Sequence, residues 1–248
     1  MLDFKTFLRR LSRIQSVYAD LGAHEVASRA GRRILQMFGR DTSNHSQWLQ
    51  QKQKIDADYD SKMEIDTGGI DELLELTIVG KNVHHGTSHI ASNPDEFRAA
   101  MSATDVDLNS FTFVDLGCGK GRALFLASGF PFRRIIGVEF AVELLEIARK
   151  NLRILKAKRP DTIDIELTLC DVATFEFPNE PLLVYLFNPF GSKIVRCISQ
   201  NLLNSASLCA RPILILYMNP VHKSDFLETG WAVVRSGPGW VLLDGQHA

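Results

Sequence analysis

The chain has 248 residues, 45% of them hydrophobic, and its 28 Lys and Arg nearly balance its 29 Asp and Glu. This composition is that of an ordinary globular protein, large enough for one α/β domain and an appendage. The four cysteines show no CxxC pair or zinc spacing, and no apolar run reaches the roughly 20 residues needed to span a bilayer. A disulfide scaffold and a membrane-spanning protein are therefore excluded, and a reducing cytoplasm is the expected compartment.

Residues 1–40 predict a basic amphipathic helix. Apolar side chains recur at three- and four-residue steps, with arginines between them. Eight Lys and Arg against three acidic residues give this segment a net charge of +5 and leave −6 for the rest of the chain. Such a helix could pack on the domain, lie peripherally on an anionic membrane surface or approach an acidic partner, and its arginines also resemble those of an organelle transit peptide. A nucleic acid is the less favoured partner.

The stretch DTSNHSQWLQQKQK, residues 41–54, is polar and predicts a linker. We therefore expect a basic helical extension with its linker over residues 1–58 and one folded domain over residues 59–248.

From residue 111 onward, segments with strand character alternate with helical ones. The strand-like segments are FTFVDLG, RRIIGVEF, IDIELTLCDV, PLLVYLFNPF and RPILILYMNP, and the helical ones are RALFLASGF, AVELLEIARKNLRILKA and KIVRCISQNLLNSA. This alternation predicts a doubly wound, Rossmann-like and mostly parallel α/β sheet, whose ligands bind beyond the carboxyl ends of the strands. The final segment WAVVRSGPGWVLLDG predicts an antiparallel hairpin on that sheet.

The segment DLGCGKG, residues 115–121, places a glycine at every second position after the first of these strands. A dinucleotide-binding loop has the pattern GxGxxG, whose third glycine lets the helix pack closely. Gly117 and Gly119 fit this pattern, but Arg122 stands in place of the third glycine, and Gly121 comes one residue early. An NAD(P)-dependent reductase is therefore the less favoured enzyme.

The pattern DxGxGxG resembles the first motif of class I S-adenosylmethionine-dependent methyltransferases. The segments DTGG at 66–69, GKGR at 119–122 and NPF at 188–190 are similar to those of a largely uncharacterised bacterial group of this family, and the resemblance runs from about residue 59 to the C-terminus. It implies the methyltransferase fold and S-adenosyl-L-methionine as the cofactor. It also implies a methyl acceptor, which is a protein side chain or a small molecule.

Cofactor contacts are implied at the ends of three strands and in one further segment. They are Asp115, Leu116, Gly117, Cys118, Gly119 and Gly121 in the glycine loop, Glu139 and Phe140 after the second strand, Asp171 and Val172 after the third, and His89 in HIASNPDEF. Asp115 can accept from the cofactor's ammonium group and Glu139 from the ribose hydroxyls. Asp171 is implied to accept from the adenine amino group, although turn capping is an alternative. His89 stands where relatives tend to have Tyr and is expected to pack less tightly on the methionine end.

The segment Asn188, Pro189 and Phe190 ends the fourth strand, where amino-group methyltransferases carry a motif of the type NPPY. The Asn188 side chain could accept a hydrogen bond from a nucleophilic amine and direct its lone pair at the methyl group, with Phe190 as an apolar wall. Asn and Pro also end strands for structural reasons alone. A non-catalytic adaptor or membrane-surface module that keeps the cofactor fold is therefore the alternative to an amine methyltransferase.

No metal site is expected. His84, His85 and His89 lie close together in the sequence, but no carboxylate follows them at ligand spacing.

Overall fold

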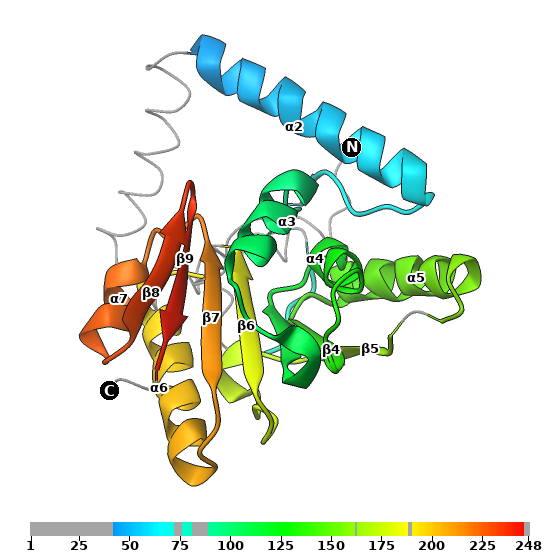
Figure 1. Ribbon diagram of the computed structural model, residues 1–248. Coiled ribbons are helices and arrows are strands. Elements are labelled where there is room, and N and C mark those ends of the chain that lie inside the picture. Colours follow the sequence, from blue (N-terminus) through cyan, green and yellow to red (C-terminus); the bar gives the residue numbers. More distant parts are fainter. Residues whose placement is uncertain (1–41, 72–75, 81–88, 162, 188–189, 246–248) are drawn as a thin grey trace. The chain divides into compact units, whose positions relative to one another are not determined.

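The computed structural model describes residues 42–71, 76–80, 89–161, 163–187 and 190–245 (Figure 1). Residues 56–248 form one compact unit and residues 1–55 another. The helix predicted within residues 1–40 lies outside the described residues.

Helix α2, Thr42–Met63, shows that residues 42–54 of the predicted linker are helical. The segment is polar, but it contains no Gly or Pro, and its Gln, Lys and Ala residues favour a helix. Its polarity therefore indicates a solvated helix and not an irregular connection.

A seven-stranded sheet lies at the centre of the unit formed by residues 56–248 (Figure 1). Its strands are β3 (Thr112–Leu116), β4 (Arg134–Glu139), β5 (Ile165–Leu169), β6 (Leu182–Phe187), β7 (Ile213–Met218), β8 (Ala232–Gly237) and β9 (Trp240–Asp244). Their order is β5-β4-β3-β6-β7-β9-β8. The first five strands in this order are parallel to one another, and β9 is antiparallel to both of its neighbours, β7 and β8. The predicted doubly wound sheet and its C-terminal hairpin are confirmed. The strand order reverses between β3 and β6, which is where such sheets bind ligands.

Helices cover both faces of this sheet. They are α3 (Pro94–Ala103), α4 (Arg122–Ala127), α5 (Val142–Lys158), α6 (Ser192–Leu208) and α7 (Lys223–Glu228). On one face, Phe97 of α3 packs edge-on against Phe113 of β3, with ring centroids 6.1 Å apart. On the other face, Val114 of β3 belongs to the same core as Ile198 of α6 and Phe226 of α7. Neighbouring strand residues therefore serve opposite faces, as the pleat requires.

A two-stranded ribbon joins the DTGG segment to the HIASNPDEF segment. Strand β1 (Ile70–Asp71) pairs antiparallel with β2 (His89–Ile90). Between them, Ile78 forms a bridge with Ala141, directly after β4. The residues described in this stretch thus meet the carboxyl ends of the sheet strands.

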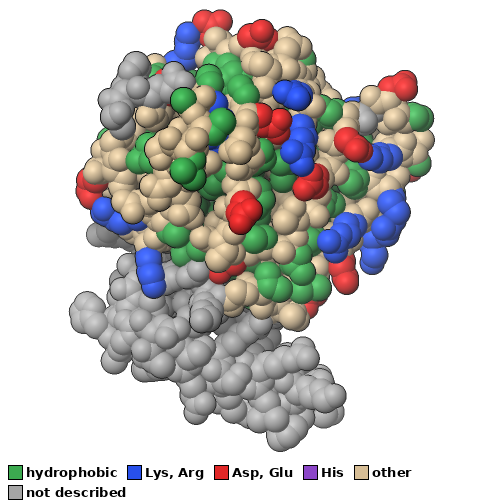
Figure 2. Space-filling model, turned by 90° about the horizontal axis from the view of Figure 1, so that it is seen from below, with side chains coloured by type: hydrophobic (Ala, Val, Ile, Leu, Met, Phe, Trp, Pro, Cys, Tyr) green, Lys and Arg blue, Asp and Glu red, His purple; other side chains and the backbone are tan. Residues whose placement is uncertain are grey.

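No helix in the described part of the chain combines the length and apolarity needed to cross a membrane. On the face shown in Figure 2, Lys and Arg side chains are interspersed with Asp and Glu. Such a mixture of signs is usual for a solvated surface.

Candidate functional site

The glycine loop between β3 and α4 is tied to β4 by backbone hydrogen bonds. The N–H groups of Gly117 and Cys118 donate to the carbonyl oxygen of Val138 at 2.8 and 3.0 Å. Gly117, Gly119 and Gly121 have φ angles of 83, 53 and 93°, in the left-handed region that glycine adopts most readily. The alternate glycines are thus required by the backbone of the turn itself.

The Glu139 carboxylate closes this loop from the end of β4. Its Oε2 accepts from the Gly119 N–H at 2.8 Å, and its Oε1 accepts from the N–H groups of Phe140 and Ala141 at 2.9 and 2.8 Å. A carboxylate has about four acceptor positions. The three backbone bonds therefore leave room for about one hydrogen bond from a ligand hydroxyl.

Asp115 of β3, which pairs with Gly137 of β4, is the second buried acid of the site. Asp115 and Glu139 are each only 3% exposed. Burial raises the pKa of Glu139, and burial together with the charge of Glu139 raises the pKa of Asp115 well above its ordinary range. Two adjacent buried carboxylates cost free energy when both are ionised, and a cationic ligand would offset that cost.

A largely apolar hollow opens at the carboxyl ends of β3, β4 and β5, and neither Asp115 nor Glu139 lines it. Its lining residues are Gly117, Val138, Phe140, Cys170, Asp171, Val172, Phe190 and Ile194. They come from the ends of β3, β4 and β5 and from the start of α6. The structure thus brings together several residues that the sequence analysis took from separate strand ends. An apolar slot with few polar groups suits a planar ring.

Asp171 has a structural role in addition to its place in the hollow. Its Oδ1 accepts from the Ala173 N–H at 3.1 Å and so caps the short 3-10 turn η4, Val172–Thr174. A Cβ on Gly80 would overlap the Asp171 side chain, so the chain passes directly over this residue. Both capping and ligand contact are therefore open to Asp171.

The imidazole of His89 lies directly on Gly119. A Cβ on Gly119 would overlap this ring at Nδ1 and Cε1. The Nε2 atom of His89 is 3.4 Å from the carbonyl oxygen of Thr67, which can only accept, so Nε2 is the donor. The missing Cβ of Gly119 thus leaves the space that the His89 ring occupies. This contact was not predicted from the sequence.

Two residues of the glycine loop face the core. Leu116 is fully buried between the sheet and α6. Cys118 is 5% exposed and packs beside Gly137, where a Cβ would lie 2.9 Å from Sγ. Burial raises the pKa of the Cys118 thiol well above its ordinary range, which keeps it neutral. These side chains pack the loop against the sheet.

Of the three predicted catalytic residues, Asn188 and Pro189 lie outside the described residues, as do His84 and His85. Phe190 is 6% exposed and lines the hollow.

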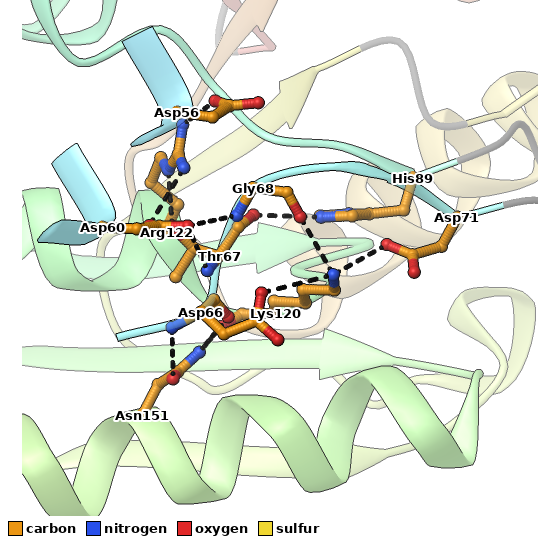
Figure 3. A network of polar contacts seen from close by, with 10 residues as sticks. All are labelled: Asp56, Asp60, Asp66, Thr67, Gly68, Asp71, His89, Lys120, Arg122 and Asn151. Carbon is orange, nitrogen blue, oxygen red and sulfur yellow. Dashed lines mark hydrogen bonds and ion pairs between the residues drawn. The ribbon is translucent and has the colours of Figure 1, made fainter. Parts of the chain in front are cut away.

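Arg122, the first residue of α4 after the glycine loop, is a buried cation whose partners were not predicted from the sequence (Figure 3). Its side chain is 1% exposed and lies over the ring of Tyr59, 4.9 Å from the centroid. Nε donates to Thr67 Oγ1 at 2.6 Å, one terminal nitrogen donates to Asp60 at 3.1 Å, and the other forms an ion pair with Asp56. All three guanidinium nitrogens thus donate to the segment of residues 56–67, and the charge is paired with two carboxylates.

The second cation of the loop, Lys120, is bound to the same segment. Its Nζ donates to the Gly68 carbonyl at 2.9 Å and lies 3.0 Å from Asp71 and 3.5 Å from Asp66 (Figure 3). One signal for this arrangement was present in the sequence. Several aspartates precede the loop, and buried cations are nearly always paired.

Comparison with known proteins gives partial similarity only. No family model matches the chain. Over 133 residues the chain is 34% identical to a histone-lysine N-methyltransferase, H3 lysine-79 specific, from Dictyostelium discoideum, a match that covers 50% of this chain and 7% of that protein.

Solved structures resemble the chain more distantly. A magnesium protoporphyrin IX methyltransferase from Synechocystis with bound SAM has 14% identity and a TM-score of 0.44, covering 61% of this chain and 77% of the other. An RNA methyltransferase from Salinibacter ruber with S-adenosyl-L-homocysteine has 20% identity and a TM-score of 0.42, covering 62% and 92%. The chain spans only a small part of its Dictyostelium relative, and the structural similarities extend over about three fifths of this chain.

Proposed function

We propose that this chain is an S-adenosylmethionine-dependent methyltransferase that transfers the methyl group to an amine nitrogen. The observation that carries the proposal is the buried pair Asp115 and Glu139 at the glycine loop, together with the apolar hollow that Gly117, Phe140 and Val172 line at the same strand ends. S-adenosylmethionine has an ammonium group, a sulfonium cation and an adenosine, and these match the acids and the apolar slot.

The charges around the loop favour this cofactor over a dinucleotide. A pyrophosphate needs free N–H donors or cations, but Lys120 and Arg122 are already bound to aspartates. The acids Asp115 and Glu139 would in addition repel a phosphate.

Each part of the cofactor has a partner in the proposed arrangement. The hollow between Phe140 and Val172 takes the adenine ring. The acceptor position left on Glu139 takes a ribose hydroxyl, and Asp115 takes the ammonium group. When bound, the cofactor supplies a methyl group already activated by the positive sulfur.

The chain then has to bind, orient and exclude water. The amine lone pair forms the new bond to the methyl carbon as the carbon–sulfur bond breaks, the bonding electrons stay on sulfur, and the nitrogen gives its extra proton to water. We assign the orientation of the amine to Asn188 and the apolar wall to Phe190. The choice of an amine is supported by the name of the Dictyostelium relative, a lysine N-methyltransferase.

Calorimetry with S-adenosylmethionine, S-adenosylhomocysteine and NADH tests the cofactor. Binding of the first two and not of NADH is expected, whereas binding of NADH alone would favour a reductase. Methyl-labelled cofactor is then incubated with the protein and with poly-lysine, nucleosomes or fractionated cell extract. Label lost in mild base would indicate a carboxyl ester and contradict the amine assignment, whereas stable label recovered as a methylated amine after complete hydrolysis identifies an N-methyl product. Cofactor binding without any labelled fraction would favour a non-catalytic module.

A further inference from the structure

The segment 56–71 is fixed to the glycine loop through buried charges, although none of its residues lines the hollow. Arg122 holds Asp56 and Asp60, and Lys120 holds the Gly68 carbonyl (Figure 3). Removing one partner of a buried ion pair leaves an uncompensated charge. Loss of either the arginine or its aspartate partners should therefore weaken the attachment of segment 56–71 to the glycine loop.

Asp60 also shapes the segment from within. Its Oδ2 accepts from the N–H groups of Thr67 and Gly68 at 2.9 and 2.8 Å, and its Oδ1 accepts from the Thr67 hydroxyl at 2.5 Å. One carboxylate therefore fixes the turn at the DTGG segment and binds Arg122 at the same time.

These contacts form a continuous path to the cofactor-binding acid. The Thr67 carbonyl oxygen accepts from His89, and the His89 ring lies on Gly119. The Gly119 N–H in turn donates to Glu139. A shift of the turn held by Asp60 would therefore reach the N–H group that orients the Glu139 carboxylate.

We propose that Asp60 and Arg122 are positioning residues, which hold the DTGG turn and His89 on the glycine loop and so fix Glu139 for the cofactor. The proposal rests on the proposed function. The motifs DTGG and GKGR then act together. Lys120 and Arg122 of GKGR bind segment 56–71, which contains DTGG, and the backbone of the glycine loop contacts the cofactor.

Thermodynamic linkage supplies a test on the unaltered chain. If segment 56–71 stabilises the loop conformation that binds the cofactor, the cofactor must stabilise the segment by the same free energy. Amide hydrogen exchange is measured with and without saturating S-adenosylmethionine. Slower exchange in peptides covering residues 64–71, together with the loop, is expected. Protection of the loop alone would overturn the positioning role, and absence of any heat of binding by calorimetry would overturn the cofactor proposal with it.

A matched pair of variants gives the second test. Asp60→Asn weakens the bonds from Arg122, Thr67 and Gly68. Glu180→Gln removes the charge of an acid that accepts from another arginine and another threonine at the opposite end of β3, namely Arg134 at 3.4 Å and the Thr112 hydroxyl at 2.7 Å.

We expect Asp60→Asn to raise the Kd for S-adenosylmethionine about 5-fold or more, and Glu180→Gln to leave it unchanged. Thermal unfolding of both variants without ligand records their losses of stability. Equal changes of Kd in the two variants, or none in either, would show that Asp60 only stabilises the fold. If Asp60→Asn does not fold, the exchange experiment decides.

Discussion

Replacing Asp115 by Asn should change stability and cofactor affinity in opposite directions. Asp115 is 3% exposed, and its pKa is raised by burial and by Glu139. At neutral pH the ligand-free protein therefore holds two unfavourable neighbouring acids. Asn has the same shape without the charge. The free energy of unfolding of the variant should therefore be higher by about 0.5–2 kcal/mol, the usual gain when an unfavourable functional residue is replaced.

The same change should weaken the binding of S-adenosylmethionine. A hydrogen bond between the ammonium group and a carboxylate contributes about 1.5–3 kcal/mol. Its loss corresponds to a rise in Kd of roughly 10- to 150-fold. Denaturant unfolding without ligand and calorimetric titration with the cofactor measure the two quantities on one preparation.

Asp225→Asn is the control for this experiment. Asp225 of α7 is also a buried acid, 4% exposed, but it is paired with Arg196 of α6 at 2.7 Å. Its replacement should lower stability and leave cofactor affinity unchanged. The reasoning about Asp115 is refuted if Asp115→Asn loses stability as Asp225→Asn does, or if its Kd is that of the unaltered protein.

Four further outcomes are expected. Gly119→Ala should weaken cofactor binding and stability because its Cβ overlaps His89, and the loss should shrink by about 1 kcal/mol or more in a His89→Ala background, as a double-mutant cycle measures. The raised pKa values of the two buried acids mean that their contribution to the stability of the ligand-free protein is most favourable below their ordinary pKa values of 3.8 and 4.5 and is lost as the pH rises through the folded values. Cofactor binding should accordingly release protons and tighten with pH, which calorimetry in buffers of different ionisation enthalpy detects. Asn188→Ala should lower kcat by about 100-fold with little change in Kd, and labelling as fast as that of the unaltered protein would contradict its catalytic role. Removal of residues 1–40 should abolish sedimentation with anionic vesicles at low salt without changing Kd, and a full-length protein that ignores such vesicles would argue for packing or a protein partner.

The parallel part of the sheet could be predicted from the sequence because its strands are short apolar segments, and β3, β4, β6 and β7 are each followed by a helix. Buried parallel strands need apolar residues on both faces, so local composition reports their position directly. The hairpin β8-β9 was predictable for a similar local reason, its Gly-Pro-Gly turn. Helix α2 was not, because polarity alone does not separate a solvated helix from a linker.

The site was predictable only where it depends on strand ends. Gly117, Phe140 and Val172 follow three different strands, and the topology of a parallel sheet places them at one edge. The contact of His89 with Gly119 depends instead on a segment that returns to the loop from far earlier in the chain. No local pattern specifies that return.

The place of Arg122 explains why the loop departs from the dinucleotide pattern. In that pattern a glycine at this position lets the helix approach the sheet. Here the glycine stands one residue earlier, and a Cβ on Gly121 would lie 2.9 Å from Cζ of Phe125 in α4 and 3.5 Å from Cβ of Ala148 in α5. The next side chain is then free to reach away from the sheet toward Asp56 and Asp60 of α2. A shift of one residue in the glycine pattern thus removes a cation from the ligand's reach and leaves the buried acids to set the charge of the site.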